Sequence, residues 1–175
     1  MDLGGSMSSQ KETPRSKPAK LRDLIFSLEM DSEEHAVYFD RETGQIVSIE
    51  SQILSSVEEN DEESLADLAD WQEAELDIAR AVVEDDGTRF IPGPDKFDFN
   101  EYRHMERFIH SQDDAKVAGE LWRAIKGPGA FRYFKDTLHR HGIQDQWYKY
   151  RDGAMKRFVI EWAEANNVPY KDDTR

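Results

Sequence analysis

Apolar side chains recur every three or four residues through the second half of the chain, and this spacing constrains the fold more than any other feature. The longest stripe runs through residues 144–166, where Trp147, Tyr150 and Phe158 share one face. Such spacing is typical of an α-helix that buries one side. We therefore predict consecutive helices from Asn100 onward, and we expect them to form the main core.

Two short segments rich in β-branched and aromatic residues predict a β-hairpin. They span residues 35–40 and 45–50, and Gly44 lies in the turn between them. Residues 89–92 predict a third strand at the sheet edge, because Pro92 and Pro94 stop it.

The segment between hairpin and third strand is polar and acidic. We expect a loop over residues 53–63 and one long helix over residues 64–85, which turns Leu65, Leu68 and Trp71 inward. With a first helix over residues 20–30, the sequence predicts an α+β fold. It is mainly helical, with about five helices and a small antiparallel hairpin or three-stranded sheet.

A chain of 175 residues fits one domain. Residues 1–19 are poor in large apolar side chains and are predicted to be a disordered tail. We expect a single domain over residues 20–170 and a frayed C-terminus over residues 171–175.

The net charge of −14 is unevenly distributed. Residues 21–88 hold three Lys or Arg against 21 Asp or Glu, a net charge of −18, whereas residues 1–20 and 89–175 each carry +2. The excess acid is either a solvated face, a surface that pairs with the basic half of the same molecule, or a binding face. A binding face of this kind would bind a basic partner, or it would belong to an inhibitor that mimics nucleic acid toward a basic protein. Its candidate residues are Glu62, Glu63, Asp67, Asp70, Glu73 and Asp77.

No residue pattern predicts catalysis, a metal site or a cofactor. The chain contains no cysteine, and its five histidines lack metal-ligand spacing. No G-x-S-x-G or phosphate-loop signature is present, and nothing distinguishes two of the many carboxylates as an acid–base pair, so an enzyme stays an open but less favoured alternative.

One basic and aromatic stretch, residues 126–152, is the best candidate for a binding site. A Gly-Pro-Gly turn opens a predicted helix there, and a helix start gathers free N–H groups that favour an anion. The candidate residues for an anion or a partner are Gly127, Gly129, Arg132, Lys135, Tyr148 and Arg151.

Aromatic and basic residues together also suggest a nucleic-acid or phosphate-ligand binder on the surface of residues 127–151. Two observations oppose it. Most of the aromatic residues, Phe131 and Phe134 among them, fall on predicted core faces, and the acidic net charge would slow association with a polyanion.

Three segments together resemble the bacterial uncharacterised protein family 0158. They are the hairpin at residues 38–47, residues 91–108, and residues 124–136 followed by Trp147-Tyr148. The likeness covers about residues 20–168, and its most specific part is GPGAFRYFKD. The resemblance implies small, soluble, mainly helical proteins, and it brings no catalytic residues to this chain.

The leading interpretation is a non-enzymatic binding or regulatory module that acts through a protein partner. No apolar run approaches the roughly 20 residues that span a bilayer, so we expect no membrane association. The lack of cysteine and of a signal-like stretch favours a cytoplasmic location.

Overall fold

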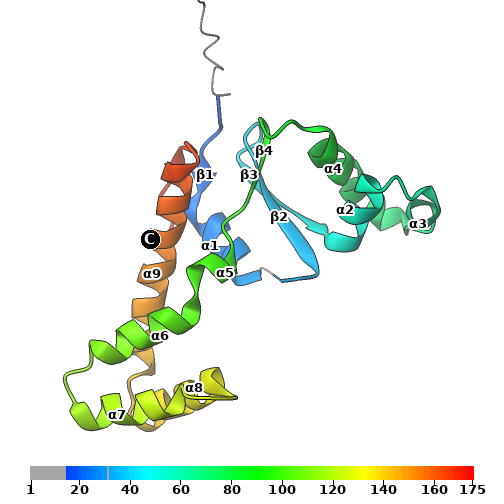
Figure 1. Ribbon diagram of the computed structural model, residues 1–175. Helices are drawn as coiled ribbons and strands as arrows, with labels where there is room; N and C mark the ends of the chain where they lie inside the picture. The colour runs from blue at the N-terminus through cyan, green and yellow to red at the C-terminus, as the bar shows by residue number, and fades with distance from the viewer. Residues whose placement is uncertain (1–14, 31) are drawn as a thin grey trace, which may run out of the picture.

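The computed structural model describes residues 15–30 and 32–175 (Figure 1). Most of the predicted N-terminal tail, residues 1–14, lies outside the described residues. The prediction is wrong for residues 17–19, because the Lys17 N–H donates to the Arg41 carbonyl and Ala19 is buried in strand β1 (Ala19–Lys20).

The predicted hairpin is confirmed. Strands β2 (His35–Asp40) and β3 (Gln45–Glu50) pair antiparallel with His35 opposite Glu50, and β4 (Phe90–Pro92) pairs on the other side of β2. The strand order β3-β2-β4 leaves β4 at an edge, as its prolines require. Gly44 has a φ of +75°, and an added Cβ would come within 2.8 Å of the Pro18 carbonyl oxygen, so the turn needs glycine.

The acidic segment differs from the prediction. The expected loop at residues 53–63 is largely helix α2 (Ser51–Glu58), which buries Ile53 and Leu54. The expected single long helix is divided into α3 (Glu62–Ala66), a 3-10 turn η1 (Asp70–Gln72) and α4 (Glu73–Glu84). The backbone is extended at Ala69, which breaks the helix and leaves the Trp71 side chain 71% exposed rather than turned inward.

Helices follow from residue 96 to the C-terminal region. They are α5 (Lys96–Phe99), α6 (Glu101–His110), α7 (Ala115–Ala124), α8 (Ala130–Arg140) and α9 (Gln144–Ala165). Asp95, Asn100 and Asp114 cap the starts of α5, α6 and α7 by accepting backbone N–H groups. The prediction of an α+β fold with a three-stranded antiparallel sheet is confirmed. The figure of about five helices is wrong, because the described residues form α1 to α9.

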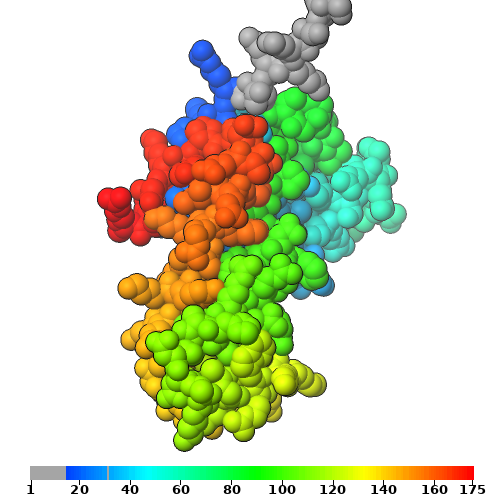
Figure 2. Space-filling view, turned by 60° about the vertical axis from the view of Figure 1, so that its left-hand side comes forward, coloured from blue at the N-terminus to red at the C-terminus, as the bar shows by residue number. Residues whose placement is uncertain are grey.

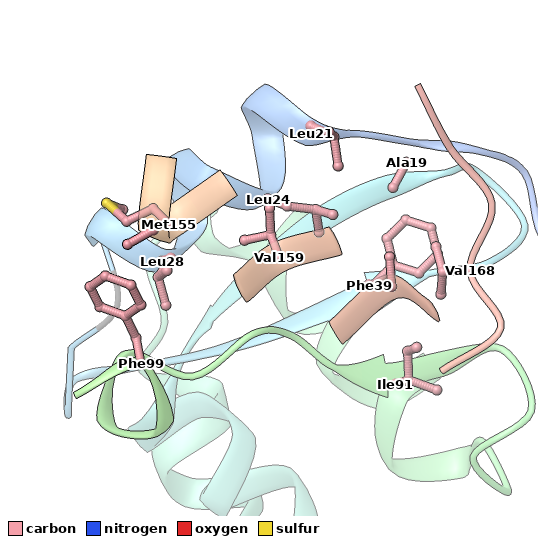
Figure 3. Close-up of a cluster of buried hydrophobic side chains, with 12 residues drawn as sticks. Ala19, Leu21, Leu24, Leu28, Phe39, Ile91, Phe99, Met155, Val159 and Val168 are labelled. Atoms are coloured by element: carbon pink, nitrogen blue, oxygen red, sulfur yellow. The ribbon is translucent and has the colours of Figure 1, made fainter. Parts of the chain in front are cut away.

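Three apolar clusters replace the single C-terminal core that we expected. The largest joins α1 (Leu21–Met30), the sheet and the second half of α9, and Figure 3 shows Val159 and Met155 of α9 beside Leu24 and Leu28 of α1. A second cluster joins α6, α7, α8 and the first half of α9. A third lies between β3, α2 and α4. Because α9 runs from the second cluster to the first, it connects the two ends of the molecule (Figures 1 and 2).

The expected fraying of residues 171–175 is also contradicted. Strand β5 (Tyr170–Lys171) pairs in parallel with β1, and Asp172 accepts a hydrogen bond from Lys156 Nζ at 2.6 Å. The Arg22 N–H donates to Asp173 Oδ1 at 2.9 Å. These contacts tie the C-terminal segment to α1 and α9.

Candidate functional site

The structure separates the six basic-surface candidates into two groups. Gly127 and Gly129 have φ values of 87° and 78° in the turn before α8, and Arg132 extends from the first turn of that helix. All three are exposed, and Arg132 makes only a 4.0 Å ion pair with Asp136. None of these three residues is among those that line the groove formed by the other three candidates.

The other three candidates, Lys135, Tyr148 and Arg151, line one groove of about 1050 Å³. We call it the aromatic groove. The loop between α1 and β2 and helix α5 lie on one side of it and α8 lies on the opposite side (Figure 1), and α6 and α9 supply the remaining lining residues, among them the buried Trp147 at its base. It is lined by Ser32, Glu33, Asp95, Lys96, Phe97, Asn100, Glu101, Tyr102, Phe131, Lys135, Trp147, Tyr148 and Arg151.

Aromatic side chains dominate the groove and remain open to solvent. The exposed fractions are 91% for Phe97, 47% for Phe131, 46% for Tyr148 and 37% for Tyr102. The indole of Trp147, only 1% exposed, closes the base, with ring centroids 4.9 Å from Phe134 and 5.3 Å from Phe108. The buried and closely packed Trp147 ring therefore lies at the base, and the exposed aromatic rings lie around it at the rim.

Arg151 is held by two carboxylates at the edge of this groove. Its Nε donates to Glu101 at 2.7 Å, and Nη1 donates to Glu29 at 3.1 Å. Burial alone would lower the pKa of this guanidinium, but the hydrogen bonds and charges of Glu101 and Glu29 outweigh it and raise the pKa. Its charge is therefore already balanced inside the protein, and it joins α9 to α6 and α1.

The remaining charges of the groove are divided between its two sides. Glu33 and Asp95 lie on the side toward the sheet, together with Lys96, whereas Lys135 lies on α8. The Asp95 carboxylate also accepts the Phe97 N–H at 2.6 Å, which fixes the start of α5 and the position of Phe97. The sheet side is thus net acidic and the α8 side is basic.

The sequence interpretation missed most of this site. Phe131 was expected in the core together with Phe134, because the two share a helical stripe, but α8 turns Ala130, Phe134 and Leu138 toward that cluster and leaves Phe131 exposed. Phe97 gave no periodic signal between Lys96 and Asp98. It lies on the one-turn helix α5, and helices this short are not recognised by the spacing of apolar residues.

The six acidic candidates form a second surface. All are exposed, on α3 and the residue that follows it, on η1 and on α4, and none forms an ion pair with another described residue. Figure 2 shows the residues of α2 and α3, in cyan, standing away from α8, in yellow. No ion pair within residues 15–30 and 32–175 joins α2–α4 to α7–α9. Pairing of the acidic residues with the basic half is therefore limited to the part outside α2–α4, where Arg151 pairs with Glu29 and Arg89 pairs with Asp40 and Glu42.

Two further absences hold for the described part of the chain. No group of three or more His, Asp or Glu side chains is placed to hold a metal ion there. None of its helices combines the length and apolar character needed to cross a bilayer.

A model of the uncharacterised protein family UPF0158 matches residues 17–173 of the chain. Neither the search of curated proteins nor the search of solved structures found a match.

Proposed function

Because the chain belongs to the uncharacterised protein family UPF0158, whose name assigns no activity, we propose its function from the aromatic groove: it is a non-enzymatic binding module that acts through a protein partner. The observation that carries this proposal is the gathering of four exposed aromatic side chains around one groove. We further propose that it acts in the cytoplasm, with which a cysteine-free chain is compatible.

Exposed aromatic rings at one place are costly in water and useful at an interface. Burial of apolar surface stabilises a complex by roughly 25 cal/mol per Å² before the costs of association. Aromatic side chains are enriched where proteins bind each other, and contiguous exposed apolar patches mark such sites. Phe97 and Phe131 are placed to supply this energy, while the ion-paired Arg151 and the buried Trp147 keep the groove in shape.

The proposal is tested by capturing partners from a lysate of the organism that makes the protein. A double variant, Phe97→Glu with Phe131→Glu, should reduce recovery of a specific protein at least tenfold, since tenfold corresponds to only about 1.4 kcal/mol. Tyr133→Glu is the matched control, because Tyr133 is an exposed aromatic residue of α8 outside the groove. Circular dichroism verifies that each variant is folded. Equal recovery by wild type and the double variant would remove the basis of the proposal.

The acidic surface supports a second candidate function, binding of a basic protein as an inhibitor that mimics nucleic acid. It is favoured by six exposed carboxylates without ion-pair partners among the described residues and by Trp71, exposed in their midst. Asp67→Asn, Asp70→Asn and Asp77→Asn together provide the corresponding variant in the same capture. Loss of the partner in this variant alone would move the binding surface from the groove to α3–α4.

Nucleic-acid or phosphate binding at residues 127–151 has less support. Arg151 is committed to Glu101 and Glu29, so Arg132 and Lys135 remain as the cations among the six candidates. Nuclease treatment of the lysate distinguishes this alternative, because material that is held through nucleic acid is lost after it.

A further inference from the structure

We propose that the occupant of the aromatic groove is an amphipathic α-helix of the partner, whose apolar stripe lies on Phe97, Phe131 and Tyr148. This inference rests on the proposed function and names the kind of partner segment that the groove accepts. The basic flank of the helix faces Glu33 and Asp95, and its acidic flank faces Lys135.

The walls of the groove favour a helix. Besides the loop between α1 and β2, its lining comes from helices, with α5 opposite α8, and Trp147, Tyr148 and Arg151 follow the i, i+1, i+4 positions of one surface of α9. Helices pack on helices by interlocking side-chain ridges at about 8–10 Å between axes. A partner helix in this groove would complete a bundle with α6, α8 and α9.

The groove offers fewer groups to the two other common modes of peptide binding. Addition of a β-strand requires an open sheet edge, and none of the lining residues belongs to a strand. Proline-rich segments bind to exposed aromatic ridges with free hydrogen-bond donors. Here the Tyr102 hydroxyl already donates to the Ile125 carbonyl at 3.1 Å and Trp147 is buried, which leaves the Tyr148 hydroxyl as the aromatic donor of the groove that makes no hydrogen bond to the described residues.

The volume and charges of the groove further define the occupant. At about 1050 Å³ it lies at the upper limit of the roughly 300–1,000 Å³ that small-molecule sites occupy, which suits a row of large side chains. Glu33 and Asp95 make the sheet side acidic despite Lys96, and Lys135 makes the α8 side basic. This polarity favours one orientation of a helix that has opposite charges on its two flanks.

The test is a selection from a phage library that displays random 16-residue peptides. Peptides are selected on the wild-type protein and depleted on the Phe97→Glu, Phe131→Glu variant. We expect enriched sequences with apolar residues at i, i+4 and i+7, Lys or Arg on one flank and Glu or Asp on the other. Synthetic versions should become helical on binding and should bind the depleting variant at least tenfold more weakly. Lys135→Glu should weaken them several-fold, with Tyr133→Glu as the control.

Three results would overturn the inference: no enrichment, proline-rich sequences, or apolar residues at every second position. They can be told apart from failure of the proposed function. If capture of a lysate protein still depends on Phe97 and Phe131, the groove binds a partner in a form other than a helix. If capture does not depend on them, the proposed function itself fails.

Discussion

Replacing Trp147 with alanine is expected to lower the free energy of unfolding by about 3–5 kcal/mol, the range found when large aromatic residues are truncated in cores. The indole is 1% exposed and packs against the rings of Phe108 and Phe134, whose centroids lie 5.3 and 4.9 Å away. Its removal leaves a cavity where α6, α8 and α9 meet, which these helices cannot close without losing other contacts. Urea unfolding followed by circular dichroism measures the change.

Tyr148→Ala is the control for this experiment, because Tyr148 is the next residue of α9 and is about half exposed. Its truncation should change stability by no more than about 0.5 kcal/mol, as for most surface substitutions. Similar losses for the two variants would contradict the placement of Trp147 at the base of the groove.

Leu24→Ala is expected to lower the free energy of unfolding by about 2–5 kcal/mol, again through loss of buried apolar contacts and a residual cavity. Leu24 is fully buried in the cluster that joins α1, the sheet and the second half of α9. Phe26→Ala is the matched control on the same helix, since Phe26 is exposed and should tolerate truncation.

The two core variants together test the prediction of one domain over residues 20–170. They lie in different clusters, but α9 belongs to both, so each should shift the same cooperative transition. The double variant should show roughly additive losses, as expected for distant sites. Two separate transitions, each moved by only one substitution, would show that the clusters unfold as independent domains.

The elements that sequence predicts well here are those whose signals are local. The hairpin has strands rich in β-branched and aromatic residues and a turn with Gly44 at positive φ, and the later strand β4 is limited by Pro92. Each of these signals acts within a few residues. The starts of α6 and α7 are similarly encoded by the caps Asn100 and Asp114.

The acidic segment escaped prediction because tertiary contacts decide its structure. Helix α2 contains Ser55 and Ser56 and has Glu58 at its C-terminal end, and both features are unfavourable for a helix. Burial of Ile53 and Leu54 against β3 and α4 offsets this cost. Neither glycine nor proline lies at the break around Ala69, so the helical spacing of apolar residues appeared to continue across it.

The site was predictable only in part, for a related reason. Residue types pointed to Lys135, Tyr148 and Arg151, which do line one groove. The charge of Arg151 is balanced by Glu29 and Glu101, which lie 122 and 50 residues away along the chain. No local sequence pattern predicts these two partners. Phe131 is exposed because the neighbouring helices pack on the face of α8 that holds Ala130, Phe134 and Leu138, and the spacing along α8 does not specify which face they cover.

Photo-crosslinking from individual positions tests the central claim, that the aromatic groove binds a protein partner, most directly. A photoreactive phenylalanine analogue is placed at Phe97, Phe131, Tyr133 or Trp71, and crosslinked proteins are identified after irradiation in cells. The account predicts that the same protein is crosslinked from Phe97 and Phe131 and not from Tyr133. Crosslinks from Trp71 alone, or none from the two groove positions, would contradict it.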